Sequence, residues 1–193
     1  ITIGLNTNFV DYASSLKQFH KGSDPYTLLD IGSNDGTFLN ACKHIGISAF
    51  GVEPASTPSD VANSNHLPTI QSFFDEKLLI YAQAQDIQIP NKFDMITFNN
   101  VLANLPSPRE SLSLAKSYLK DSTSLIAVQT GYHPLQFSRG LFDYVYHEHF
   151  SYFSIHSISK LALSCGLKVV KISTSNLRGG TIRFFLSDIS RSE

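Results

Sequence analysis

The stretch from Thr27 to Gly36 restricts the fold of this chain more than any other feature of its sequence. Thr27-Leu28-Leu29-Asp30-Ile31 is short and almost continuously apolar, as expected for a buried strand of a parallel sheet. Gly32 and Gly36 allow a tight turn after it, and helical spacing follows over residues 37–45. A strand, a glycine turn and a helix in this order predict an α/β unit that binds ligands at the carboxyl edge of its sheet.

Strand-like and helical segments alternate along the rest of the chain, which predicts a parallel sheet with helical crossovers. Further strands are expected at residues 49–52, 68–70, 93–98, 125–128, 168–173 and 181–186. Helices are expected at residues 8–20, 59–65, 76–84, after Pro108, and at residues 156–165. Residues 131–154 are predicted to form an irregular loop, crowded with aromatics and histidines and therefore functional.

Length and composition favour a single domain and exclude several classes of function. With 193 residues, 42% of them hydrophobic, the chain is expected to form an N-terminal helical extension over residues 1–25 and a ligand-binding domain over residues 26–193. A net charge of -1 argues against nucleic acid as a partner, and no apolar run is long enough for a membrane span. Two distant cysteines, Cys42 and Cys165, indicate a cytoplasmic protein. Because it begins at Ile1, we expect it to derive from a longer chain.

An acid at the end of the second strand, Glu53, indicates which kind of ligand the glycine turn binds. An acid in this place accepts the hydroxyl hydrogens of a ribose. The turn reads D-x-G-x-x-x-G, and Asp35 would repel a pyrophosphate at the helix N-terminus. A cofactor with a ribose and a sulfonium but no phosphate, S-adenosylmethionine, suits this loop better. The alternative is a purely structural turn in which an Asp caps the helix.

The predicted cofactor site draws on several other residues near the carboxyl edge of the sheet. Asn99, Asn100 and Val101 follow the fourth strand, where the amides can hold the methionine end or the adenine. Phe73, after the third strand, can flank the adenine ring, although it can equally be a core residue. From the glycine turn itself the predicted cofactor-binding residues are Asp30, Gly32, Ser33, Asn34, Asp35 and Gly36.

Five motifs together resemble one family, the class I methyltransferases that methylate carbon of nucleotide-linked 4-keto-deoxysugars. LDIGSNDGTFL, GVEPA, FNNVLANL, YHEHFSYFS and RGGTIR occur in that family's order over residues 27–187. The resemblance implies a Rossmann-like fold with a mostly parallel seven-stranded sheet, an antiparallel last strand and helices on both faces. It also adds Pro54 to the cofactor site and implies S-adenosylhomocysteine as product. The chain departs from the family at Asn104, where a His is common, and at Gln129, where many relatives carry an acid.

Methylation of carbon requires a base that removes a proton beside a carbonyl, and a donor that stabilises the resulting enolate. Tyr146-His147-Glu148-His149 offers such groups. We predict His149 as general base, Glu148 as the residue that orients it, and Tyr146 as hydrogen-bond donor to the keto oxygen. Exchanged roles for Tyr146 and His149 stay open, as does a packed aromatic loop without catalytic function. Asn104 is predicted to donate a hydrogen bond to the enolate.

The predicted substrate is a small molecule, a nucleotide-sugar, whose phosphates are expected near the last strand. Arg183 is the main candidate for binding them, with Arg178 and His147 as further substrate-binding residues. Arg183 can also simply pair with a neighbouring acid. No metal site is expected, because His-x-His with one Glu lacks zinc-ligand spacing. Two other functions stay open: an O- or N-methyltransferase of another small metabolite, and an inactive nucleoside-binding module. The sequence leaves the oligomeric state open.

Overall fold

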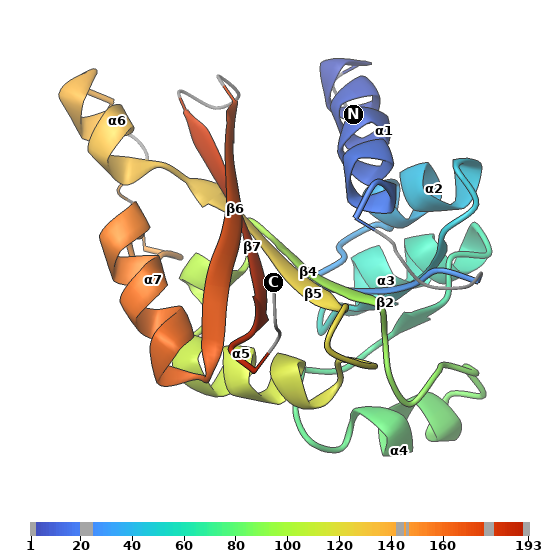
Figure 1. The fold of residues 1–193 in the computed structure, drawn as a ribbon. Helices are drawn as coiled ribbons and strands as arrows, with labels where there is room; N and C mark the ends of the chain where they lie inside the picture. The colour runs from blue at the N-terminus through green and yellow to red at the C-terminus, as the bar shows by residue number, and fades with distance from the viewer. Residues whose placement is uncertain (1–2, 20–24, 142–144, 146, 176–179, 191–193) are drawn as a thin grey trace. The chain divides into compact units, whose positions relative to one another are not determined.

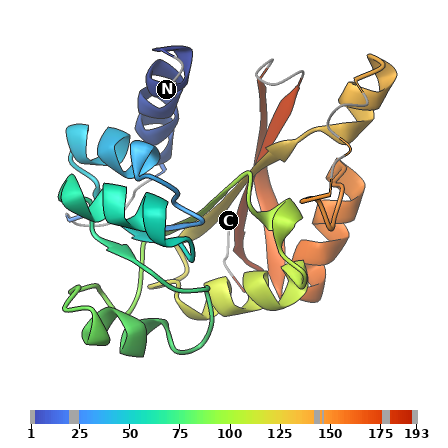
Figure 2. The ribbon, with the colours of Figure 1, turned by 180° about the vertical axis from the view of Figure 1, so that it is seen from behind.

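A computed structural model describes residues 3–19, 25–141, 145, 147–175 and 180–190 (Figures 1 and 2). The chain divides into two compact units. The first unit comprises residues 1–96 and 118–124, and the second comprises residues 97–117 and 125–193. Each unit is described separately below. The predicted division into residues 1–25 and 26–193 follows a different boundary and stays a prediction.

Seven strands form one mixed sheet in the order β3-β2-β1-β4-β5-β7-β6. The strands are β1 (Thr27–Ile31), β2 (Ser48–Val52), β3 (Thr69–Ile70), β4 (Met95–Asn99), β5 (Leu125–Gly131), β6 (Leu167–Ser175) and β7 (Thr181–Asp188). β1 and β3 both pair with β2 in parallel, whereas β7 is antiparallel to both β5 and β6. The predicted fold class, a Rossmann-like sheet with an antiparallel last strand, is confirmed.

Along the chain, the helices of the first unit precede or follow β1, β2 and β3. They lie close to their predicted positions. They are α1 (Ile3–Lys17), α2 (Thr37–His44), α3 (Ser56–Ser64) and α4 (Leu78–Ala84). α1 starts earlier and ends earlier than predicted from the apolar spacing of residues 8–20. It packs on α2 through aromatic rings, since Phe38 lies 5.5 Å from Phe9 and 5.1 Å from Tyr12 between ring centroids.

A buried carboxylate fixes the beginning of β1. Asp94 Oδ2 accepts hydrogen bonds from the backbone N–H of Thr27 at 2.9 Å and from its hydroxyl at 2.8 Å. Lys120 Nζ lies 3.3 Å from the other oxygen, Asp94 Oδ1. Because Leu28, Leu29 and Ile31 are buried, the strand is held at its polar start and along its apolar length. This places the glycine turn at a defined point after Ile31.

The second unit contains η1 (Leu102–Asn104), α5 (Pro108–Ser117), α6 (His133–Ser138) and α7 (Ile155–Ser164). A capping box begins α7, in which Ser154 accepts the N–H of Ser157 and the Ser157 hydroxyl accepts the N–H of Ser154. Lys116 Nζ of α5 lies 3.0 Å from Asp188 Oδ2 at the end of β7. The end of β7 is thus linked to α5 at the lower end of the unit as drawn in Figure 1.

The prediction that residues 131–154 form one irregular loop is wrong in part, because α6 occupies residues 133–138. Pro134 lies in the first turn of this helix, a position that proline favours. The N–H of Tyr132 donates to Gly180 O at 2.9 Å, and Gln136 Nε2 donates to the same oxygen at 3.3 Å. These long-range hydrogen bonds stabilise a helix that local sequence signals do not reveal.

Within the described ranges, no helix has both the length and the apolar character needed to cross a membrane. The same residues contain no group of three or more His, Cys, Asp or Glu side chains arranged to hold a metal ion.

Candidate active site

The turn after β1 has the backbone conformation that its glycines and asparagine allow. Gly32, Asn34 and Gly36 have φ angles of 71°, 52° and 77°, in the left-handed region that glycine and asparagine tolerate best. The N–H groups of Gly32 and Ser33 both donate to Val52 O, at 2.8 and 3.2 Å. The turn therefore folds against the end of β2.

The carboxylate of Glu53 holds this turn from the neighbouring strand end. Its Oε2 accepts the N–H of Asn34 at 3.0 Å, and its Oε1 accepts the N–H of Ala55 at 2.9 Å. Glu53 is only 9% exposed. Each carboxylate oxygen can accept more than one hydrogen bond, so Glu53 retains capacity for the hydroxyl groups of a ligand. Pro54, which follows it, is exposed.

Close packing behind the turn surrounds the buried hydroxyl of Ser33. A Cβ atom at Gly36 would lie 2.8 Å from Leu67 Cδ1, and one at Gly51 would lie 2.8 Å from Thr69 Oγ1. Ser33 is 4% exposed, and its hydroxyl oxygen has no hydrogen-bond partner among the described residues. A Cβ atom at Gly51 would lie 2.3 Å from this oxygen, so the Ser33 hydroxyl packs against β2.

The acids of the turn differ in environment. Asp30 is buried at the end of β1, while Asp35 is partly exposed and accepts two hydrogen bonds at Oδ1 from Thr37, the first residue of α2. Asp35 thus satisfies a free N–H at the start of α2, the structural function that the sequence also allowed.

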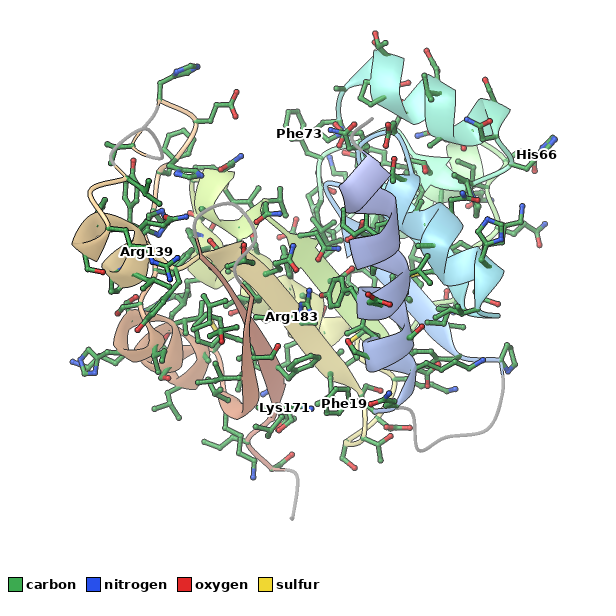
Figure 3. The ribbon with its side chains drawn as sticks, turned by 90° about the horizontal axis from the view of Figure 1, so that it is seen from above. Phe19, His66, Phe73, Arg139, Lys171 and Arg183 are labelled. Carbon is green, nitrogen blue, oxygen red and sulfur yellow. The ribbon has the colours of Figure 1, made fainter. Side chains whose placement is uncertain are left out.

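Phe73 is 75% exposed (Figure 3), and Phe74 lies 6.0 Å from Tyr118 between ring centroids.

In the second unit, the predicted residues after β4 form a turn and η1. Asn100 has a φ of 58°, and its N–H donates to Gln129 O at 2.9 Å. Val101 precedes η1 and accepts the N–H of Asn104 at 2.8 Å. Asn99 is half-buried at the end of β4. The Asn104 Oδ1 atom is buried and has no hydrogen-bond partner within the described part of the chain.

His149 lies in a segment that is attached to η1. The N–H groups of Phe150 and Ser151 both donate to Ala103 O, at 2.8 and 3.1 Å. His147 and Glu148 are exposed, and the predicted hydrogen-bond donor Tyr146 lies outside the described residues. The structure therefore brings His149 and Asn104 to neighbouring stretches of backbone.

Two residues that sequence reasoning missed face the His149 ring. His133 lies 5.7 Å from His149 between ring centroids at an interplanar angle of 87°, and Tyr152 lies 5.4 Å from it at 86°. His133 lies two residues after the end of β5, where a parallel sheet presents ligand-binding residues. That position is an available signal in the sequence, but the expected irregular loop over residues 131–154 obscures it.

Arg183 is paired within the sheet. Gln129 and Arg183 are opposite each other on β5 and β7, and Arg183 Nη2 donates to Gln129 Oε1 at 2.5 Å (Figure 3 labels Arg183). Arg183 therefore pairs with the amide of Gln129, whereas the sequence allowed pairing with a neighbouring acid. Arg178 and Gly179 lie outside the described residues. Gly180 has a φ of 130°, and a Cβ atom there would lie 2.8 Å from Leu135 Cδ2.

Comparison with known protein families identifies the family of this chain. Residues 7–172 match the profile of a family described as a methyltransferase domain. The chain belongs to this methyltransferase family. It is an S-adenosylmethionine-dependent domain of class I, and the Glu53 carboxylate, which retains acceptor capacity beside the turn, fits the ribose hydroxyls of that cofactor.

Similar proteins support the family and the fold. The methyltransferase domain is 29% identical over 164 residues to C-methyltransferase NovU from Streptomyces niveus, an alignment that covers 84% of this chain and 38% of NovU. A methyltransferase structure from Archaeoglobus fulgidus has a TM-score of 0.70 at 18% identity, covering 95% and 94% of the two chains. Magnesium protoporphyrin IX methyltransferase from Synechocystis, with bound S-adenosylhomocysteine, has a TM-score of 0.65 at 12% identity, covering 96% and 82%.

Proposed function

We propose that this methyltransferase domain transfers a methyl group to carbon of a nucleotide-linked 4-keto-deoxysugar through an enolate. S-adenosylmethionine supplies the electrophilic methyl group when it is bound, and S-adenosylhomocysteine is the product. The similarity to a C-methyltransferase supports carbon as the acceptor. The chain spans 38% of the length of that relative, so the sugar and its nucleotide are part of the proposal.

The cofactor residues in this proposal lie on the turn after β1 and at or after the ends of β2, β3 and β4. Glu53, already fixed by two backbone N–H groups, accepts the ribose hydroxyls. Ser33 donates its buried hydroxyl to the cofactor, since no described residue uses it. Asp30, Gly32, Asn34, Asp35, Gly36, Pro54, Phe73, Asn99, Asn100 and Val101 complete the proposed set.

The acid-base step depends on His149 and Asn104. The imidazole of His149 takes the proton from the carbon beside the keto group, and the electrons of that C–H bond move to the keto oxygen. Asn104 and Tyr146 stabilise the resulting oxyanion by donating hydrogen bonds, and Glu148 orients His149. Bound S-adenosylmethionine would supply the methyl group to the enolate carbon.

The observation that carries this proposal is the placement of His149. Its segment is fixed to η1 by two hydrogen bonds to Ala103 O, next to Asn104, whose amide oxygen is buried without a described partner. In the proposed reaction the amide nitrogen Nδ2 of the same side chain is the group that donates to the oxyanion. A base and an amide donor on adjacent backbone are the pair that enolate formation requires.

Arg183 is proposed to bind the diphosphate of the sugar nucleotide, together with His147 and Arg178. Gln129 Oε1 occupies one donor of the Arg183 guanidinium, which has five N–H groups in total. Gln129 is a neutral amide and places no negative charge beside Arg183. An anionic ligand therefore gains more from Arg183 than it would if residue 129 were an acid.

Exchange of the sugar proton with solvent tests the proposed function. The chain with S-adenosylhomocysteine and a thymidine-diphosphate-linked 4-keto-6-deoxyglucose in heavy water should incorporate deuterium beside the keto group, as followed by NMR. His149→Gln should abolish this exchange, whereas the control His156→Gln, at an exposed histidine of α7, should not. Methylation on oxygen or nitrogen without exchange would support the other reaction, and failure to bind the cofactor would support an inactive nucleoside-binding module.

A further inference from the structure

His133 is a buried histidine for which the proposed reaction has no use so far. It is the first residue of α6 and is 2% exposed. Neither ring nitrogen makes a hydrogen bond of ordinary geometry with the described residues. Buried imidazoles are normally held by such bonds. We therefore attribute the position of this ring mainly to its packing, with the Phe153 backbone as a polar neighbour. Its burial also excludes His133 as the base that contacts the sugar.

The ring packs against two others, edge to face. His133 lies 4.6 Å from Tyr152 at 81° and 5.7 Å from His149 at 87°, between ring centroids. His149 and Tyr152 in turn face each other at 5.4 Å and 86°. Each ring of this three-ring cluster (His133, His149 and Tyr152) contacts both others in the orientation that aromatic pairs prefer. The plane of the His149 imidazole is therefore determined from two sides.

Both backbones that carry the cluster are anchored. On one side, Tyr132 and Gln136 hold the first turn of α6 to Gly180 O. On the other side, the N–H groups of Phe150 and Ser151 hold the segment after His149 to Ala103 O. His133 is thus a rigid contact between two fixed segments, and Tyr152 is 38% exposed at the open side of the cluster.

The electrostatics of His133 suit a residue beside a base. Burial lowers the pKa of His133 most, and the nearby His149 lowers it further, while the Phe153 backbone acts in the opposite direction. His133 therefore stays neutral near neutral pH. When His149 accepts a proton, a neutral neighbour avoids the repulsion that a second imidazolium would cause.

We propose that His133 is a positioning residue for the reaction: its buried ring fixes the plane of the His149 imidazole, so that a ring nitrogen of His149 points at the sugar carbon. This inference rests on the proposed function, in which His149 is the general base. It predicts that an aromatic ring at residue 133 is needed, and that its nitrogen atoms are not.

Two substitutions of similar volume separate these requirements. His133→Phe keeps a ring, whereas His133→Leu fills the space without one. We expect His133→Leu to lower kcat for deuterium exchange and methyl transfer about 100-fold with little change in KM, since misplacement of a catalytic group by about 1 Å has such an effect. His133→Phe should restore most of the rate. Pro134→Ala, an exposed change in the same helical turn, serves as the control and should leave kcat unchanged.

The carbon-bound ring protons of His149, observed by NMR, give a readout that does not depend on activity. Their resonances should move strongly in His133→Leu, because a facing ring is lost, and much less in Pro134→Ala. Unchanged resonances in His133→Leu, or a folded His133→Phe as slow as His133→Leu, would overturn the inference. If the parent chain exchanges no sugar proton, the proposed function fails, while the NMR comparison still decides whether His133 orients His149.

Discussion

Glu53 Oε2 lies 3.0 Å from the backbone nitrogen of Asn34, so a carboxylate at the end of β2 fixes the turn that follows β1. Its other oxygen accepts the N–H of Ala55. The same side chain therefore shapes the turn and, in the proposed function, binds the ribose. Loss of the carboxylate should affect the cofactor both directly and through the turn.

Glu53→Ala should weaken S-adenosylmethionine binding about 10- to 150-fold, because hydrogen bonds to a charged group contribute about 1.5–3 kcal/mol. Isothermal titration calorimetry of the folded variant measures this change. Asp60→Ala, at an exposed acid on α3, provides a control of equal charge change. Equal affinity for the parent and Glu53→Ala would contradict the proposed ribose contact.

Gly36→Ala should destabilise the chain by about 2–5 kcal/mol, the sum of a left-handed backbone cost and of overpacking against Leu67. Gly140→Ala isolates the backbone contribution, since Gly140 has a φ of +70° with nothing within 4 Å of a built Cβ. It should cost about 1–2 kcal/mol. Urea unfolding compares the two variants, and equal losses would show that Leu67 moves aside without cost.

Asp188 makes the stability of the fold sensitive to acid. Hydrogen bonds from the Ser190 backbone and hydroxyl, and then Lys116, lower the pKa of Asp188 from its ordinary value of 3.8 to about 2. Because the folded state holds this proton more weakly than the unfolded chain, the stabilisation is complete above about pH 4. It is lost as the pH falls to about 2.

Asp188→Asn should therefore flatten the dependence of the melting temperature on pH between about pH 4 and 2. Asp86→Asn, an exposed acid in the first unit, should leave that dependence as in the parent. An unchanged slope for Asp188→Asn would mean that other carboxyl groups determine acid unfolding.

Arg183→Met should raise the KM for the nucleotide-sugar at least tenfold, since one charged contact to a phosphate contributes about 1.4 kcal/mol or more. Its kcat should change little, because the proposed contact lies on the diphosphate and away from the reacting carbon. Gln129→Ala removes the partner amide but keeps the cation, so its KM should stay close to that of the parent. The reverse order of these two effects would assign Arg183 a structural role within the sheet.

The sequence allowed much of the fold to be predicted where local patterns and burial agree. β1 occupies residues 27–31 as predicted, because a short apolar run before a glycine turn has few other solutions. α6 was missed because the bonds from Tyr132 and Gln136 that stabilise the helix reach Gly180, far along the chain. β6 extends to Ser175, beyond its predicted end, through pairing with β7.

In the candidate site, too, some features could be predicted from the sequence and others could not. Glu53 was found because its position at a strand end follows directly from the pattern, and the structure places it against the glycine turn. The contact of His133 and Tyr152 with His149 was not found, since it depends on how α6 and the segment after His149 pack. Ring packing between segments that are distant in sequence has no periodic signal in a single chain.

Transfer of a labelled methyl group tests the central claim most directly. The chain is incubated with S-adenosylmethionine carrying an isotopically labelled methyl carbon and with the 4-keto-deoxysugar nucleotide, and the product is analysed by NMR. Our account predicts a new methyl group bonded to a sugar carbon beside the keto group, with no product from His149→Gln. A label bonded to oxygen or nitrogen, or a product formed equally well by His149→Gln, would contradict it.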